Sequence, residues 1–235
     1  MLVQAGTEYK RSEGTPDMFK DRLDAAEKLS RALDRYRNQH ALILAIPRGA
    51  VPMARHIASR LDAEVDVVLV RKLPSPYNPE FALGAVDETG WMYIADHAAR
   101  YGGTSEYLDQ ESARQLAVMQ HRRREYTPIR PPLDPAGRIV IVVDDGLATG
   151  STMIAALHAL RARNPARLIC AVPVAPPDTA IKVGAYCDEM ICLEAPRVFH
   201  AVGQFYQTFP QVSDAEVVAA LAGQGPRYFP EGSGT

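Results

Sequence analysis

Residues 138–160 read RIVIVVDDGLATGSTMIAALHAL, and this stretch decides the fold. Its β-branched run at 139–143 has no alternation of apolar and polar residues, which predicts a central parallel strand covered on both faces. Apolar residues at helical spacing then predict a helix that begins near Ser151. The stretch is therefore expected to be a strand, a loop and a helix of an α/β protein.

The loop between that strand and that helix suits a sugar phosphate. Gly146 and Gly150 permit a tight turn, and the amides and hydroxyls of residues 149–152 gather at a helix N-terminus, which is a phosphate site. Asp144 and Asp145 cannot hold the same phosphate because like charges repel, so they are expected to face sugar hydroxyls or a Mg²⁺ ion. A phosphate close to a diol describes a ribose 5-phosphate.

The segment VVDDGLATGST at 142–152 closely resembles the phosphoribosyl-pyrophosphate (PRPP) motif of the type I phosphoribosyltransferases. In that family, two adjacent acids bind the ribose and the following turn binds the 5-phosphate. The resemblance assigns the ribose to Asp144 and Asp145, and the phosphate to Ala148, Thr149, Gly150, Ser151 and Thr152. A Rossmann-type turn with a solvated acid pair is the structural alternative. Walker and dinucleotide loops are excluded, because neither Gly-Lys-Ser/Thr nor G-x-G-x-x-G occurs here.

Composition is that of an ordinary globular protein. The 235 residues are 47% hydrophobic and 23% charged, and we expect one domain at 17–222 between a loose arm at 1–16 and a flexible tail at 223–235. A net charge of −2 offers no footprint for nucleic acid, and three cysteines without ligand spacing argue against structural zinc. No apolar leader or membrane-spanning window is present, which predicts a cytoplasmic protein.

A second anion site is expected upstream. A buried strand at 41–46 runs into a turn that contains Arg48 and Gly49, and a short helix follows to about Leu61. In the family that the motif resembles, this turn is the loop that binds the leaving pyrophosphate through its backbone amides. Arg48 and Gly49 are the residues that match that loop. The alternative is a plain turn, which Gly and Pro after a strand often mark.

Two cations follow the next expected strand, at 66–70. Arg71 and Lys72 resemble the pair that opens the mobile catalytic loop of several phosphoribosyltransferases, although two adjacent cations could also be a solvated edge. The proline-rich segment 73–81 has the composition of a lid, which would exclude water from a cation-like transition state. A hairpin is expected at 82–86 and 91–94, and a polar helix at 104–126 could support a homodimer.

Strands and helices alternate through the rest of the chain, which predicts a mostly parallel, twisted sheet with helices on both faces. The aromatic-rich segment at about 196–213 does not fit this alternation, and in the resemblance it is a small C-terminal hood that selects the acceptor. Phe205 or Tyr206 could stack on an acceptor base. Alternatively, these rings pack the last helix, 214–221, against the sheet.

The resemblance implies a Mg²⁺-dependent transferase that moves the phosphoribosyl group of PRPP to a nitrogenous base or related acceptor and releases pyrophosphate. Its catalytic residues would be Asp144, Asp145, Lys72 and Arg71, with Mg²⁺ reached by the acids through ribose hydroxyls or water. Enzymes acting on 6-oxopurines usually carry an acid at the position of Ala148, so hypoxanthine and guanine are less favoured and the acceptor stays open. A PRPP-binding regulator without transferase activity and a sugar-phosphate or nucleotide hydrolase are the alternatives.

Overall fold

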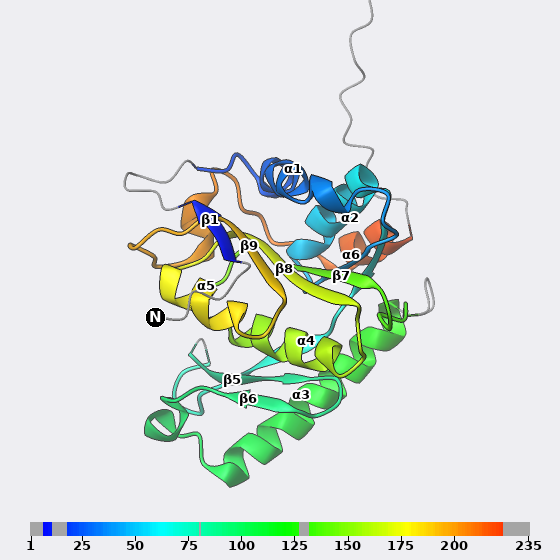
Figure 1. The fold of residues 1–235 in the computed structure, drawn as a ribbon. Coiled ribbons are helices and arrows are strands. Elements are labelled where there is room, and N and C mark those ends of the chain that lie inside the picture. The colour runs from blue at the N-terminus through cyan, green and yellow to red at the C-terminus, as the bar shows by residue number, and fades with distance from the viewer. Residues whose placement is uncertain (1–6, 11–17, 80, 127–131, 223–235) are drawn as a thin grey trace, which may run out of the picture.

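The computed structural model describes residues 7–10, 18–79, 81–126 and 132–222. Helices α1 and α2 cover one face of a six-stranded sheet and α4 and α5 cover the other, and a three-stranded sheet and α3 lie beyond α4 (Figure 1). The helices are α1 (Arg22–Ala32), α2 (Ala50–Leu61), α3 (Ser105–Tyr126), α4 (Ser151–Arg161), α5 (Pro177–Gly184) and α6 (Asp214–Leu221). The strands are β1 (Thr7–Lys10), β2 (Leu42–Ala45), β3 (Glu64–Val67), β4 (Val70–Pro74), β5 (Ala82–Asp87), β6 (Met92–Ile94), β7 (Ile139–Val143), β8 (Arg167–Val174) and β9 (Glu189–Glu194).

The large sheet has the order β1-β9-β8-β7-β2-β3, and all of its strand pairs are parallel. Along β7, Ile141 and Val143 pack in the core under α1 and α2, whereas Val140 and Val142 pack in the core under α4. A strand buried on both faces needs apolar residues at every position, and β7 supplies them. The predicted strand at 139–143, the helix from Ser151 and the doubly covered parallel sheet are therefore confirmed.

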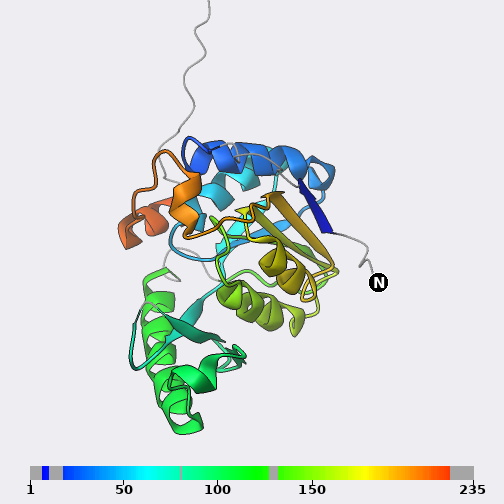
Figure 2. The ribbon, with the colours of Figure 1, turned by 90° about the vertical axis from the view of Figure 1, so that its left-hand side faces the viewer.

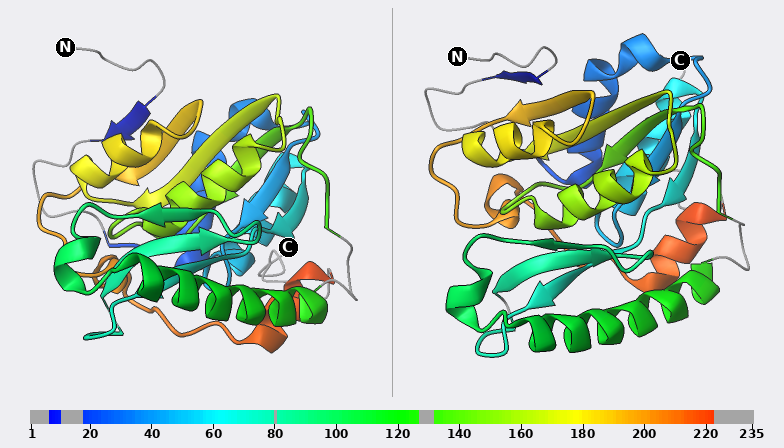
Figure 3. Two further views of the ribbon diagram at one scale, coloured as in Figure 1. Left: turned by 90° about the horizontal axis from the view of Figure 1, so that it is seen from below. Right: turned by 60° about the horizontal axis from the view of Figure 1, so that its bottom comes forward.

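The small sheet has the order β4-β5-β6 and is antiparallel. It stands with α3 beside the main sheet (Figure 2), and α3 lies along its outer side (Figure 3). The hairpin expected at 82–86 and 91–94 and the polar helix at 104–126 are confirmed. The single strand expected at 66–70 is wrong, because β3 ends at Val67 and β4 begins a new sheet at Val70. Its apolar run continues through both strands, so the pattern does not show where the chain changes sheet.

The N-terminal residues differ from the expected loose arm. Residues 7–10 form β1, which pairs in parallel with β9 at the edge of the large sheet. An edge strand is held by backbone hydrogen bonds, so it needs no apolar pattern that the sequence could display. The other residues of the expected arm, and the expected tail at 223–235, lie outside the described residues.

Beyond β9, the segment 196–213 contains one short regular element, the 3₁₀ helix Val202–Phe205. The small C-terminal hood expected at about 196–213 is therefore not confirmed. It leads to α6, whose start is fixed by Ser213 through a hydrogen bond of 3.2 Å from the Glu216 amide to the Ser213 hydroxyl. Among the helices of the described chain, none combines the length and apolar character that crossing a membrane requires.

Candidate functional site

A cavity of about 470 Å³ lies at the carboxyl edge of the large sheet. Its walls come from the loops after β2 and β7, from β4 in the small sheet, and from single residues of α3 and the 196–213 segment. The predicted residues that line it are Arg48, Gly49, Arg71, Lys72, Asp144, Asp145, Ala148, Thr149, Gly150, Ser151 and Thr152. The fold therefore joins in one place three groups that are far apart in the sequence.

Strand register explains why the two loops meet. β2 and β7 are neighbours, with Ala45 opposite Val143, and the Ile46 amide donates to the Val143 carbonyl at 3.1 Å. Both strands therefore end at the same level, and the Arg48-Gly49 turn lies beside the acid pair. Ligand sites of open α/β sheets are found at this carboxyl edge. The Pro47–Arg48 peptide bond in this turn is cis.

The acid pair is held by its own backbone. The Asp145 amide donates to Oδ1 of Asp144 at 2.9 Å.

Burial raises the pKa of Asp144, and the nearby Asp145 charge raises it further, while Lys72 and Arg22 oppose the shift. Burial also raises the pKa of Asp145, against the attraction of Arg22. Ionising two partly buried carboxylates side by side costs free energy, and a cationic ligand group or hydroxyl donors would lower that cost.

The phosphate loop ends in an open helix N-terminus. Gly150 has a φ of 75° and precedes α4, and the Ser151 amide makes a long hydrogen bond of 3.5 Å to the Thr149 hydroxyl. Amides in the first turn of a helix have no partner within the helix, so they can bind an anion. A Cβ on Gly150 would lie 2.6 Å from Cγ2 of Val183, so both the backbone and the space require glycine. The hydroxyls of Thr149 and Ser151 lie 3.2 Å apart at the same end of the helix.

Cations from the small sheet also line the cavity. Arg71 and Lys72 lie within β4 rather than after a strand of the main sheet, and Nε of Arg71 donates to Oε1 of Gln115 at 2.9 Å. Burial lowers the pKa of Arg71, and the charges of Arg122 and Arg48 lower it further. A group of like charges this close favours a polyanion as its ligand.

Phe205 and Tyr206 do not line the cavity, which corrects the expected stacking role. Their side chains are 3% and 4% exposed, and Tyr206 packs against Phe19 and Phe209 with ring centroids 5.4 and 4.7 Å away. Rings covered on these sides have no free face for a base. Of the fully described segment 196–213, Val202 is the residue that reaches the cavity wall.

Two polar residues that contribute to the site were not predicted. Gln115 of α3 lines the cavity and, through its amide, also donates to Oε1 of Glu111 at 2.5 Å. Arg22 of α1 is paired with Asp145, with Nη2 2.9 Å from Oδ2. Each is a single polar residue on a helix without a neighbouring motif, so neither carries a signal in the sequence.

The acid pair also fits a Mg²⁺ ion. Within the described ranges, no cluster of three His, Cys, Asp or Glu side chains could hold a metal by itself. Mg²⁺ is commonly bound by one or two carboxylates together with substrate phosphates. Asp144 and Asp145 supply two such carboxylates beside the phosphate loop, so the ion would be shared with a phosphorylated ligand.

Comparison with known proteins agrees with this geometry. The sequence model of the phosphoribosyl transferase domain matches residues 15–209. The chain belongs to the phosphoribosyl transferase domain family. This match spans all the cavity residues named above.

Proteins similar to this phosphoribosyl transferase domain include two from Mycobacterium tuberculosis and one from Thermus thermophilus. The protein named "Putative phosphoribosyl transferase Rv0571c" of Mycobacterium tuberculosis is 40% identical over 207 residues, which cover 87% of this chain and 46% of that protein. A second strain of the same species has a protein with the same identity and coverage. The chain thus spans about half the length of these relatives. The crystal structure of TT1426 from Thermus thermophilus is 42% identical, with a TM-score of 0.74 over 88% of this chain and 99% of that one.

Proposed function

We propose that this chain transfers the 5-phosphoribosyl group of PRPP to a nitrogenous base or a related small acceptor and releases pyrophosphate. The observation that carries the proposal is what this one cavity contains: an acid pair, an open helix N-terminus and a group of cations. PRPP has a diol, a 5-phosphate and a pyrophosphate. Each part of PRPP has a matching group among the lining residues.

The matching groups give PRPP one orientation. The 5-phosphate would accept hydrogen bonds from the amides and hydroxyls of residues 149–152 at the start of α4. The ribose hydroxyls would donate to Asp144 and Asp145. The pyrophosphate would lie toward the Arg48-Gly49 turn and the cations Arg71 and Lys72, which line the same cavity.

The reaction replaces one bond at C1 of the ribose with another. The bond from C1 to the pyrophosphate oxygen breaks, and its electron pair leaves with pyrophosphate. The lone pair of the acceptor nitrogen forms the new bond to C1, and the proton of that nitrogen is lost to water or base. Mg²⁺, when bound, would neutralise charge on the pyrophosphate. The chain's own part is positioning and electrostatics, so no covalent protein nucleophile is needed.

The charged side chains of the cavity are opposite in sign to the charges that develop during this step. Negative charge grows on the leaving pyrophosphate, where Arg71 and Lys72 would stabilise it, and positive charge grows on the ribose beside Asp144 and Asp145. Pro74 and Pro79, in and after β4, also line the cavity. We infer that residues 75–79, which follow β4, cover bound PRPP and keep water from C1.

The acceptor is the open part of the proposal. Ala148 has no carboxylate with which to take a proton from a 6-oxopurine, which makes hypoxanthine and guanine less favoured. The rings of Phe205 and Tyr206 are buried, so stacking on them does not select the base. A panel that includes adenine, pyrimidine bases and simple amines is therefore the appropriate screen.

Calorimetric titration of the purified chain with PRPP in the presence of Mg²⁺, repeated with ribose 5-phosphate, tests the site. We expect PRPP to bind more tightly than ribose 5-phosphate, because PRPP also engages the cations. A panel of acceptors, followed by mass spectrometry of the nucleotide products, then tests the transfer. Failure of a folded protein to bind either ligand would rule the proposal out.

A further inference from the structure

Arg22, the first residue of α1, makes three kinds of contact, one of them with Asp145. Its Nε and Nη2 atoms lie 3.0 and 2.9 Å from Oδ2 of Asp145. Its Nη1 donates to the Pro210 carbonyl at 2.6 Å, and its guanidinium carbon lies 3.7 Å from the centre of the Phe209 ring. The Arg22 side chain is only 11% exposed. A side chain restrained in this way has one position.

Arg22 contacts one of the two oxygens of the Asp145 carboxylate. Both Arg22 nitrogens meet the same oxygen, Oδ2, so the Arg22 contacts do not engage Oδ1. Oδ1 is therefore available to a hydroxyl donor in the cavity that Asp145 lines. The bound guanidinium also offsets the charge of a carboxylate whose side chain is 18% exposed, which makes the second negative charge of the acid pair less costly.

The segment after β9 restrains the backbone of the same residue. The Tyr206 hydroxyl donates to the Asp145 carbonyl at 2.6 Å, and the Tyr206 ring packs on Phe209, which in turn packs on Arg22. Asp145 is thus held through its carbonyl by Tyr206 and through its carboxylate by Arg22. These residues come from two regions that are not part of the PRPP motif.

We propose that Arg22 is a positioning residue for the ribose, and that with Tyr206, Phe209 and Pro210 it forms an Arg22 clamp. The clamp orients Asp145 so that Oδ1 can accept a hydrogen bond from a ribose hydroxyl. In this chain the aromatic residues after β9 therefore serve the ribose end of the cavity. This inference rests on the proposed function, because it requires PRPP to be the ligand.

The competing explanation is that Arg22 only fastens α1 to the 206–210 segment. Such a fastening would contribute to the free energy of unfolding and would affect all ligands of the cavity alike. A positioning role instead affects ligands that contain ribose and spares pyrophosphate alone, which has no hydroxyl for Asp145. The two explanations therefore predict different orders of affinity.

The test is Arg22→Met, which keeps a long side chain but removes the charge and the donors. Affinities for PRPP, ribose 5-phosphate and pyrophosphate would be measured by calorimetry at one fixed Mg²⁺ concentration. We expect about a tenfold loss for the two ribose ligands, the loss typical of one charged hydrogen bond, and no more than about a twofold loss for pyrophosphate. Equal losses for all three ligands would overturn the clamp.

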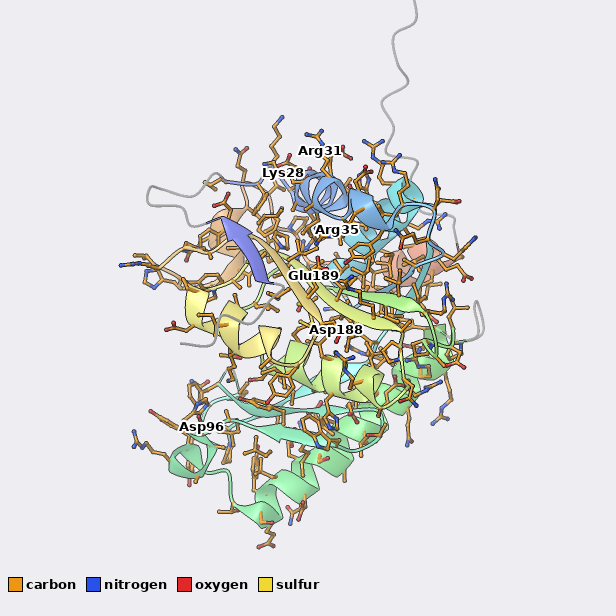
Figure 4. The ribbon with its side chains drawn as sticks, in the orientation of Figure 1. Lys28, Arg31, Arg35, Asp96, Asp188 and Glu189 are labelled. Carbon is orange, nitrogen blue, oxygen red and sulfur yellow. The ribbon has the colours of Figure 1, made fainter. Side chains whose placement is uncertain are left out.

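Arg31→Met is the matched control, because Arg31 lies on the same helix and is 75% exposed. Figure 4 shows Arg31 at the outer side of α1, away from the large sheet. Arg31→Met should leave the affinities for PRPP, ribose 5-phosphate and pyrophosphate unchanged. Lys at position 22 offers one compact cation without the planar fork, so Arg22→Lys should recover part of the ribose affinity lost in Arg22→Met.

A double-mutant cycle with Asp145→Asn separates a direct from an indirect effect. If Arg22 acts through Asp145, Arg22→Met should cost little further affinity in the Asp145→Asn background, and additive losses would overturn the clamp. If Arg22→Met does not fold, Phe209→Leu removes the stacking partner alone and should produce a smaller loss in the same ligand order. Wild-type protein that binds no PRPP would refute the proposed function itself, whereas wild-type binding with an unaffected Arg22→Met would refute only the clamp.

Discussion

A Cβ atom on Gly49 would lie 2.1 Å from Oδ2 of Asp145 and 3.1 Å from Nε of Arg22. The turn after β2 and the acid pair after β7 therefore touch at a point where no side chain fits. This contact links the proposed pyrophosphate and ribose sites. It also makes Gly49 a residue whose replacement should disturb the ligand site more than the fold.

Gly49→Ala should weaken PRPP binding at least about tenfold, because the added methyl group forces the Asp145 carboxylate away from Arg22. Calorimetry with PRPP and Mg²⁺ measures the effect. Gly137→Ala is the control: Gly137 has a φ of 67° and open space around its Cβ, so alanine there should lower stability by about 1 kcal/mol without changing affinity. Wild-type affinity in Gly49→Ala would contradict this prediction.

Asp145→Asn should weaken PRPP binding by at least ~1.4 kcal/mol, a tenfold loss, because it removes a charged acceptor for the ribose. The matched control is Asp96→Asn, since Asp96 is exposed and lies on the small sheet's side of the molecule, as labelled in Figure 4. The same titration measures both variants. Unchanged affinity in Asp145→Asn would remove the acid pair from the ribose site.

Lys72→Ala should lower kcat by about tenfold or more and change PRPP affinity by no more than about threefold, because Lys72 acts on charge that grows on the leaving group. Steady-state kinetics with the acceptor found in the screen, combined with PRPP titration, separate the two effects. Lys28→Ala, on the outer side of α1 (Figure 4), is the control. A loss of PRPP affinity with kcat unchanged would assign Lys72 to ground-state binding.

Glu27→Gln should destabilise the protein near neutral pH by about 1 kcal/mol, a modest value because the ion pairs that Glu27 makes are partly exposed. Glu27 accepts from Nε and Nη2 of Arg60 at 3.0 and 2.7 Å, and from His56 at 2.9 Å. The Arg60 hydrogen bonds, against burial and with help from His56, lower the pKa of Glu27 from 4.5 to about 2.

The stability difference between wild type and Glu27→Gln should depend on pH, in a direction set by the lowered pKa of Glu27. Since the folded-state pKa of Glu27 lies below its unfolded value, the stabilisation is complete above about pH 5 and is lost as the pH falls toward about 2. Urea unfolding of wild type and Glu27→Gln at several pH values measures it. A difference that stays constant down to pH 3 would show that Glu27 does not contribute through its charge.

The central strand, loop and helix of this protein could be predicted from the sequence because their features lie in consecutive residues. The strand at 139–143, the acid pair, the turn at Gly150 and the start of α4 are consecutive, so residue preferences and periodicity predict the backbone and its ligand groups together. The β5–β6 hairpin and α3 are predictable for the same reason.

Only the tertiary structure decided the rest, because it depends on neighbours far away in the chain. The apolar run at 65–70 does not show that the chain changes sheet, which places Arg71 and Lys72 in a separate wall of the cavity. The aromatic pattern at 205–209 does not show which ring faces are covered. Arg22 meets Asp145 across 123 residues of sequence, and Tyr206 reaches the Asp145 carbonyl across 61. Such contacts follow from how the elements pack, because no periodicity within one element records its partner in another.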